Sequence, residues 1–127
     1  MQLSMPSSWM QIDAVDEISS YKCMEKILKS PQIPSAVFCS GDIFAIGAMK
    51  CAKDNGYRIP EDISFIAIDD ILLSGYYEPR LTTIRIDKEK MGSLAMELIM
   101  KKLNGEQVES IFIESNNIIV RESVFHL

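Results

Sequence analysis

The sequence predicts an α/β fold in which helices cover a parallel β-sheet. Short, wholly apolar runs alternate with longer segments whose apolar residues recur every three or four positions, which is the pattern of buried parallel strands joined by helices. The 127 residues, 47% of them apolar, suffice for one domain with its own core.

The first expected helix covers residues 16–29. Its apolar side chains fall on one face, while lysines and a glutamate occupy the other. Pro31 and Pro34 end the helix. The preceding residues 8–12 can form a short strand.

A strand and a second helix follow directly. Residues 36–39 are all apolar, as expected of a strand buried on both faces. The spacing of the apolar residues then changes from that of a strand to that of a helix, and a helix is expected over residues 42–55. Asp42 suits its N-cap, and Gly56 suits the position just after its end.

The second half repeats the order of strand and helix. We expect a buried strand at residues 63–68, an irregular segment, and a weaker strand at residues 81–86. Asp87 can cap the next helix, residues 88–103. The last expected strands are residues 108–113 and 118–120, separated by 115–117. Together these elements predict a sheet with helices on both faces.

The charge and the N-terminal segment exclude several kinds of partner. The net charge is −5, from 13 basic and 18 acidic residues, which makes a lone domain a poor binder of phosphate backbones. The N-terminal segment has no Lys or Arg before Lys22 and no long apolar run. It therefore predicts neither a secretory signal nor a membrane span.

Cysteine and histidine usage narrows the chemistry. Cys23, Cys39 and Cys51 have neither metal-ligand spacing nor an even number for disulfides, so we interpret them as reduced core residues. The single histidine, His126, lies next to the C-terminus. A Ser-His-Asp, Cys-His or multi-histidine zinc site is not expected.

Two segments follow strands and can hold a ligand at the carboxyl edge of the sheet. One contains Gly41 and Asp42, and the other contains Asp69 and Asp70. A carboxylate there can accept two hydroxyl groups, although Asp42 can instead cap a helix and Asp69 a turn. Asp69 and Asp70 are adjacent and point to opposite sides in an extended segment, which disfavours a glycosidase pair.

Six segments with the right order and gaps carry a family resemblance. They are PSAVFCSGDIFAIGAMK (34–50), RIPEDISFIAIDD (58–70), YEPRLTTIR (77–85), KMGSLAMELI (90–99), LNGE (103–106) and VRES (120–123). Together they resemble the lactose-repressor family, the lactose/galactose-repressor type of bacterial transcription regulator.

The resemblance implies a periplasmic-binding-protein-like effector domain of two α/β lobes. Residues 1–127 match its C-terminal portion, mostly the second lobe, as part of a three-layer sandwich. The DNA-binding head and most of the first lobe are expected to lie outside this chain. The resemblance further implies a cytoplasmic protein without catalytic role or cofactor, and no direct contact of this chain with nucleic acid or membrane.

The resemblance also places effector contacts in this sequence. Asp69 falls on an Asp that contacts effector hydroxyls. Gly41 falls on the residue before Asp in the family's Asn-Asp or Gly-Asp pair, and a glycine there provides no side-chain contact to a sugar. Val15 falls where several members have a stacking aromatic residue, and Ile86 where the family has Gln. Only Asp69 keeps a polar side chain, so a sugar-like and a purine-like effector both stay open.

The family pairs through the second expected helix and the irregular segment before residue 81. We therefore expect a homodimer. The interface residues are predicted to be Phe44, Ile46, Gly47, Leu72, Tyr76 and Tyr77. The apolar side chains of the irregular segment, Leu72, Leu73, Tyr76 and Tyr77, can instead fold inward onto the core of their own chain.

Three other functions stay open. The chain can belong to a periplasmic-type sugar-binding protein, or be a truncated reading frame without function. It can also be a small hydrolase using Asp69 or Asp42, although no base, metal cluster or nucleophile elbow accompanies these carboxylates.

Overall fold

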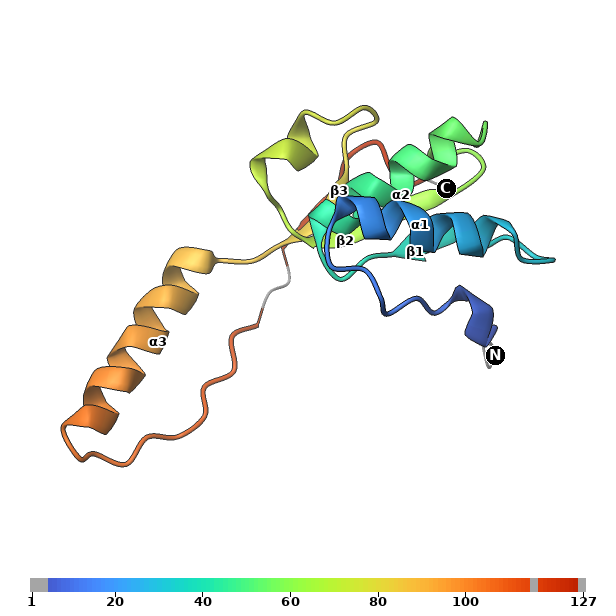
Figure 1. Ribbon diagram of the computed structural model, residues 1–127. Helices are drawn as coiled ribbons and strands as arrows, with labels where there is room; N and C mark the ends of the chain where they lie inside the picture. Colours follow the sequence, from blue (N-terminus) through green and yellow to red (C-terminus); the bar gives the residue numbers. More distant parts are fainter. Residues whose placement is uncertain (1–4, 115–116, 126–127) are drawn as a thin grey trace.

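A four-stranded sheet forms the centre of the computed structural model, which describes residues 5–114 and 117–125 (Figure 1). β1 (Ala36–Phe38), β2 (Ser64–Asp69) and β3 (Thr82–Arg85) are parallel neighbours, and β4 (Ile118–Ile119) runs antiparallel to β3. The predicted α/β class with a mostly parallel sheet is confirmed. The expected strand at residues 118–120 is present as β4, but its antiparallel direction was not predicted.

Two helices, α1 (Glu17–Leu28) and α2 (Asp42–Asp54), pack against each other and cover one face of the sheet. Phe65 and Ala67 of β2 are fully buried beneath them. The helices approach closely at Gly47, where an added Cβ would lie 2.1 Å from the carbonyl oxygen of Glu17. This contact requires a residue without a side chain.

The third helix, α3 (Lys88–Leu103), begins where the sequence predicts. The Asp87 carboxylate caps it by accepting a 2.9 Å hydrogen bond from the backbone N–H of Lys90. The helix projects away from the body, however, and none of its side chains is buried (Figure 1). Within the described residues, the second face of the sheet carries no helix, so the expected covering of both faces is wrong for this chain.

Some local predictions also need correction. Residues 8–12 form no strand; a short 3-10 helix, η1 (Ser7–Trp9), lies there instead. Residues 108–113 form no strand either, because they run beside α3 rather than along the sheet. β1 is not buried on both faces, since Phe38 points to the uncovered side and is 62% exposed.

The three cysteines are free thiols, as predicted. Burial raises the pKa of Cys39 to about 12, with a further contribution from the charge of Asp42, and burial raises the pKa of Cys51 to about 11. Neither thiol therefore ionises readily near neutral pH. His126 and most of the predicted turn at 115–117 lie outside the described residues.

In the described ranges, no helix combines the length and the apolar character needed to cross a membrane. The same residues contain no group of three or more His, Cys, Asp or Glu side chains arranged to hold a metal ion.

Candidate functional site

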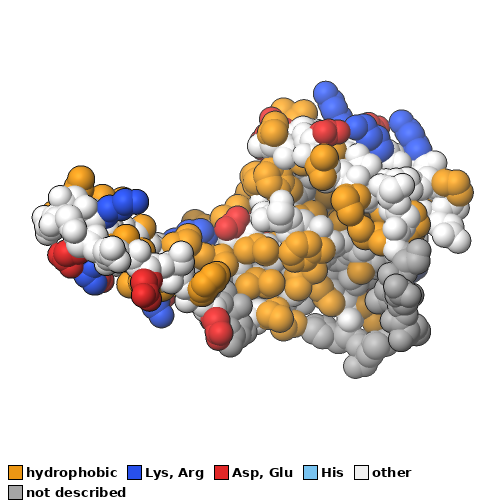
Figure 2. Space-filling model, turned by 90° about the horizontal axis from the view of Figure 1, so that it is seen from below, with side chains coloured by type: hydrophobic (Ala, Val, Ile, Leu, Met, Phe, Trp, Pro, Cys, Tyr) orange, Lys and Arg blue, Asp and Glu red, His pale blue; other side chains and the backbone are white. Residues whose placement is uncertain are grey.

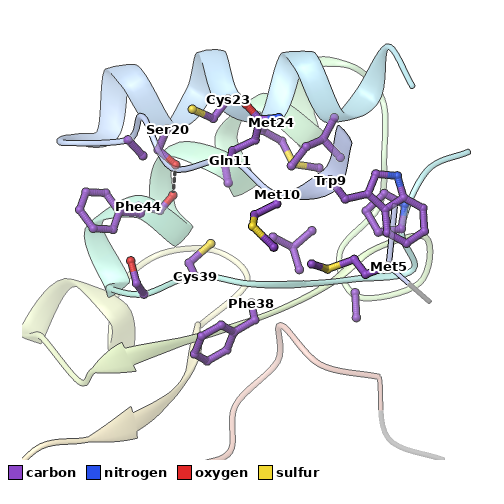
Figure 3. Close-up of a pocket in the computed structure, with 17 residues that line it drawn as sticks. Met5, Trp9, Met10, Gln11, Ser20, Cys23, Met24, Phe38, Cys39 and Phe44 are labelled. Atoms are coloured by element: carbon purple, nitrogen blue, oxygen red, sulfur yellow. Dashed lines mark hydrogen bonds between the residues drawn. The ribbon is translucent and has the colours of Figure 1, made fainter. Parts of the chain in front are cut away.

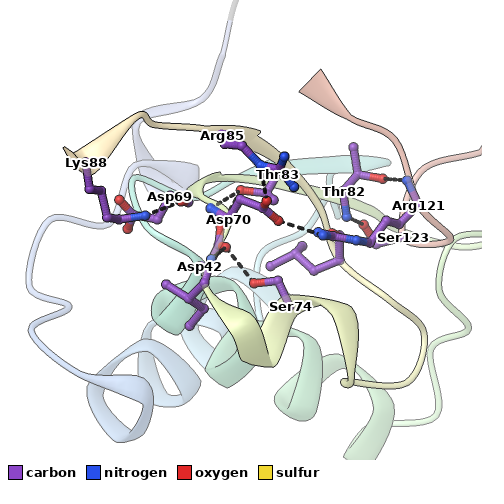
Figure 4. A network of polar contacts seen from close by, with 12 residues as sticks. Asp42, Asp69, Asp70, Ser74, Thr82, Thr83, Arg85, Lys88, Arg121 and Ser123 are labelled. Carbon is purple, nitrogen blue, oxygen red and sulfur yellow. Dashed lines mark hydrogen bonds and ion pairs between the residues drawn. The ribbon is translucent and has the colours of Figure 1, made fainter. Parts of the chain in front are cut away.

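Polar side chains from three segments meet at the carboxyl edge of the sheet (Figure 4). Asp69 ends β2 and Asp70 follows it, while Asp42 begins α2 and Thr83 lies on β3. Asp69 and Asp70 both have positive φ values, 125° and 51°. Such backbone conformations cost roughly 1–3 kcal/mol for a non-glycine residue and concentrate at functional sites.

Asp42 is fully buried and serves the fold. Its carboxylate accepts hydrogen bonds from the hydroxyl groups of Thr83 and Ser74, both at 2.5 Å, and from the backbone N–H of Ile71 at 2.9 Å. The prediction that Asp42 caps α2 is wrong, because Gly41 occupies the N-cap position and Asp42 is the first helical residue. All of these contacts are internal to the chain, so Asp42 is not available to a ligand.

Asp70 is held by two arginines. Its carboxylate accepts hydrogen bonds of 2.6 Å from Arg85 Nε and from Arg121 Nη2. Burial opposes ionisation of Asp70, but these two hydrogen bonds and the positive charges outweigh burial and hold its pKa below the ordinary value of 3.8. Arg121 also donates to the carbonyl oxygen of Leu81 at 2.7 Å. Asp70 therefore ties the strand ends together.

Asp69 differs from its two neighbours at this edge. It is only partly buried, and no hydrogen bond or ion pair from another described residue reaches its carboxylate. Its backbone carbonyl accepts a hydrogen bond from Lys88 Nζ at the start of α3. A Cβ added at Gly41 would lie 3.3 Å from Asp69 Oδ2. The same Cβ would lie 3.4 Å from Cδ2 and Cε2 of Phe44, so a side chain at position 41 would be crowded between the Phe44 ring and the one uncommitted carboxylate of this edge.

The structure therefore brings Asp69 and Gly41 together, and Ile86 lies close by. Asp69 pairs in register with Arg85, the residue before Ile86. Val15 lies just before α1, whose first turn is at the same edge as that of α2 (Figure 1), and its side chain is 80% exposed. Val15 and Ile86 have aliphatic side chains and Gly41 has none. Of the four predicted ligand residues, Asp69 is therefore the one with a polar side chain.

Sequence reasoning missed Lys88, Arg121 and Thr83. Lys88 stands at the start of a predicted helix, where nothing in the sequence links it to Asp69. Arg121 lies 51 residues after Asp70, and no local pattern reports a pairing at that separation. The contact between the Thr83 hydroxyl and the Asp42 carboxylate depends on β3 lying beside β2, which the sequence alone does not give.

A separate hollow of about 300 Å³ lies between the N-terminal segment, α1 and β1 (Figure 3). Its lining is mainly apolar and includes Trp9, Met24, Cys39 and Phe44. None of the three aspartates of the sheet edge lines it. Phe44, predicted at a dimer interface, contributes to the rim of this hollow, but its ring points away from it and lies beside Gly41 (Figure 3).

The other predicted interface residues divide into two groups. Ile46 and Gly47 line a groove of about 350 Å³ between α1 and α2, which also includes Ile18 and Tyr21. Exposed side chains of the segment after β2 are Leu72, 80% exposed, and Tyr76, 77% exposed. Tyr77 instead packs partly against the core, and the Lys53 ammonium lies 5.6 Å from the centre of its ring.

Comparison with known proteins identifies the fold and its relatives. The sequence profile of the periplasmic binding protein-like domain family matches residues 4–124. The HTH-type transcriptional repressor PurR of Pasteurella multocida is 37% identical over 123 residues, which are 96% of this chain and 37% of that repressor. The chain thus spans little more than a third of the length of this curated relative.

Solved structures agree with this fold. A LacI family transcriptional regulator from Mycobacterium smegmatis superposes with a TM-score of 0.88 at 24% identity, over 96% of this chain and 46% of that one. The lac repressor dimer bound to operator and the anti-inducer ONPF superposes with a TM-score of 0.79 at 25% identity, over 87% and 39% of the two chains.

These relatives confirm the resemblance to lactose-repressor-type regulators, and they are transcription regulators rather than enzymes. The profile match extends over nearly the whole chain and includes the sheet edge with Asp69 and Asp70. The chain therefore belongs to the periplasmic binding protein-like domain family.

Proposed function

We propose that this chain is the effector-sensing and dimerising part of a bacterial transcription regulator, and that its effector binds at Asp69. The observation that carries the proposal is the contrast among three carboxylates at one sheet edge. Asp42 and Asp70 are fully used within the fold, whereas the Asp69 carboxylate has no partner among the described residues and sits on a strained backbone.

The chemistry of Asp69 favours an effector that donates hydrogen bonds. An ionised carboxylate accepts and does not donate, so suitable groups are the hydroxyls of a sugar or the ring N–H of a purine. A side chain at position 41 would crowd Oδ2 of Asp69, and glycine avoids this contact. The aliphatic Val15 and Ile86 supply no further polar contact, which leaves both classes of effector as candidates.

The proposed mechanism is a shift between two arrangements of the effector-binding region. An effector that binds one arrangement more tightly increases its population, and this changes how paired DNA-binding heads lie on operator DNA. The chain itself, with a net charge of −5, makes no contact with the operator in this proposal. It acts in the cytoplasm as part of a longer homodimeric protein.

Dimerisation is proposed through the outer side of α1 and α2. The groove with Ile18, Ile46 and Gly47 lies on this helix pair, and Leu72 and Tyr76 add exposed apolar area from the segment after β2. Apolar groups grouped in this way mark interaction surfaces.

A chimeric repressor tests the proposal. Residues 1–127 replace the matching segment of the Pasteurella multocida PurR repressor, and purine bases and monosaccharides are screened by calorimetry. We expect one ligand class to bind and to change the affinity for labelled operator DNA. A folded chimera that binds ligand without any change in operator affinity would instead support a simple binding protein.

Two variants place the ligand at Asp69. Asp69→Asn should weaken binding by about 1–3 kcal/mol, the contribution of a hydrogen bond to a charged group. Asp62→Asn, at an exposed carboxylate paired with Arg58, should leave binding unchanged. The 127-residue chain alone should bind no sugar or purine tighter than about millimolar. A hydrogen bond to Asp69 contributes about 1–3 kcal/mol, whereas millimolar affinity already needs about 4 kcal/mol.

A further inference from the structure

The backbone at Asp69 is held on both sides of the residue. Before it, β2 pairs in register with β3 up to Asp69 and Arg85. After it, the carbonyl oxygen accepts a hydrogen bond from Lys88 Nζ, and the N–H of Asp70 donates to the Thr83 hydroxyl at 3.3 Å. A peptide bond is planar, so contacts that hold the peptides on both sides also fix φ and ψ of the residue between them. The φ of 125° at Asp69 is therefore imposed by its surroundings.

Asp70 carries the strongest restraint on this part of the chain. Its side chain is 7% exposed, and its two carboxylate oxygens accept separate hydrogen bonds of 2.6 Å from Arg85 and Arg121. Hydrogen bonds between ionised groups are roughly twice as strong as those between neutral groups, and burial strengthens them because little water competes for the charges. These three residues form the Asp70 clamp. The clamp holds Asp70 at its own positive φ of 51°, next to Asp69.

The clamp lies where α3 joins the body. Arg85 ends β3, just before the two residues that lead into α3, and Arg121 follows β4, by which the chain returns to the sheet. Charged side chains of both signs lie at this junction, beside the mainly hydrophobic underside of the body (Figure 2). The clamp thus joins three segments that are distant in sequence, and Asp69 stands next to their meeting point.

The direction of the Asp69 carboxylate depends on this backbone conformation. A change in φ rotates the Cα–Cβ bond relative to the preceding peptide, so a relaxed Asp69 would direct its side chain elsewhere. At the φ of 125°, its Oδ2 lies 3.3 Å from the Cβ position of residue 41 at the start of α2. Asp70 points toward Arg121, whereas Asp69 lies on the side of Lys88 (Figure 4). The clamp and the uncommitted carboxylate therefore occupy separate places at the sheet edge.

We propose that Asp70 is a positioning residue for the effector site: the clamp holds Asp69 in the strained conformation that keeps its carboxylate available to the effector. Asp70 itself does not touch the effector, because Arg85 and Arg121 occupy both of its carboxylate oxygens. The proposal rests on the proposed function for the binding of an effector, whereas the restraint on Asp69 is a property of the chain alone. A carboxylate held in place before binding loses little conformational freedom when the effector binds.

A double-mutant cycle in the full chain tests the restraint without a ligand. In wild type, Asp69→Gly should raise the folding equilibrium constant about five-fold, because glycine removes the strain. Asp70→Asn releases Asp69, so the same change should give no increase in this background. Urea denaturation measures both. The same effect of Asp69→Gly in the two backgrounds would overturn the proposal, because independent changes add.

Two further backgrounds complete the cycle. Glu122→Gln removes a carboxylate that pairs with Arg80 at 2.6 Å, outside the clamp, so the increase seen in wild type should persist. Arg85→Gln, at a side chain that is 53% exposed, removes one arginine of the clamp and should reduce the increase. If Asp70→Asn does not fold, Arg85→Gln decides the question, and an undiminished increase in it would contradict the proposal.

The φ of Asp69 is also accessible by NMR. The three-bond coupling between the amide proton and Hα is small at a φ of 125° and large at the extended φ of a strand. We expect a small coupling at Asp69 in wild type and in Glu122→Gln, and a large one in Asp70→Asn. An unchanged coupling in Asp70→Asn would show that the clamp does not impose the conformation.

The chimeric repressor measures the consequence for binding. Calorimetry with the purine base or monosaccharide that binds it should show about ten-fold weaker binding in Asp70→Asn, because a released Asp69 must return to its strained conformation. Glu122→Gln should bind as the unmodified chimera does. An unchanged affinity in Asp70→Asn would exclude the positioning role. A chimera that binds none of the purines and monosaccharides would contradict the proposed function, whereas the cycle and the coupling decide the restraint on Asp69.

Discussion

The Asp42 carboxylate at the start of α2 accepts a 2.5 Å hydrogen bond from the Thr83 hydroxyl on β3. Both residues are fully buried, and Ser74 and Ile71 complete the surroundings of the carboxylate. A buried charge is tolerated when its hydrogen-bonding capacity is met. This bond therefore fixes the position of α2 relative to β3 at the edge where Asp69 lies.

Removing the Asp42 carboxylate should destabilise the chain strongly. Asp42→Ala leaves two buried hydroxyl donors and the partly buried N–H of Ile71 without an acceptor, and we expect the free energy of unfolding to fall by about 3–5 kcal/mol. Urea denaturation measures the change. Asp54→Ala removes an exposed carboxylate paired with Lys50 at 2.8 Å and should cost less than about 1 kcal/mol. Equal losses for the two variants would contradict a structural role of Asp42.

Two glycines on helices should respond oppositely to alanine. In Gly47→Ala, the new methyl group would lie 2.1 Å from the Glu17 carbonyl oxygen, so α1 and α2 must separate, at a cost of about 1–3 kcal/mol. In Gly92→Ala, the methyl group meets no atom within 4 Å, and the higher helix propensity of alanine should gain up to about 1 kcal/mol. Thermal unfolding followed by circular dichroism compares them.

Acid should remove the contribution of Asp70 to stability. Because the pKa of Asp70 is held below 3.8 in the folded protein, the unfolded chain binds more protons at acidic pH. The contribution is complete above about pH 4 and is lost as the pH falls through the folded-state pKa. The difference in unfolding free energy between wild type and Asp70→Asn should therefore narrow below about pH 4. Asp13→Asn, at an exposed carboxylate 3.7 Å from Lys26, should show a far smaller difference at any pH.

The backbone strain at Asp69 should be measurable as stability. Glycine adopts a φ of 125° without steric cost, so Asp69→Gly should gain about 1 kcal/mol after the entropy cost of glycine is subtracted. Asp69→Ala retains the Cβ and should show no gain. A loss of stability in Asp69→Gly would mean that the carboxylate supports the fold rather than a ligand.

The proposed dimer surface predicts a change in mass. At tens of micromolar, light scattering of the wild-type chain should give the mass of a dimer. Leu72→Asp, at a side chain that is 80% exposed, should give a monomer with an unchanged circular dichroism spectrum. A monomer before the Leu72 change would argue against a dimer through α1 and α2.

Local patterns predicted most of the fold because they report local physics. The bounds of α1, α2 and α3 follow from periodicity and flanking residues, and Gly56 ends α2 with a φ of 84°, as its position predicts. The failures are non-local. Residues 36–39 are apolar enough for a strand covered on both faces, but whether a helix covers Phe38 is decided elsewhere in the chain.

The candidate site divides in the same way. The position of Asp69 and Asp70 after a strand was enough to place them at the sheet edge. Their different roles were not predictable, because Arg85 on β3 and Arg121, which follows β4, reach Asp70 from distant parts of the sequence. Asp42 shows the same limit, since a cap and a buried carboxylate have the same local sequence and differ only in whether Thr83 and Ser74 face it.

The separation of 51 residues between Asp70 and Arg121 has a consequence for synthesis of the chain. Ribosomes add about 5–20 residues per second, so β2 leaves the ribosome several seconds before its second arginine. During that interval Asp70 has only Arg85 nearby, and the strand ends cannot be tied together. The sheet edge proposed to hold the effector is therefore completed only after α1 and α2 have been synthesised, and a chain that ends before Arg121 would lack the second hydrogen bond to Asp70.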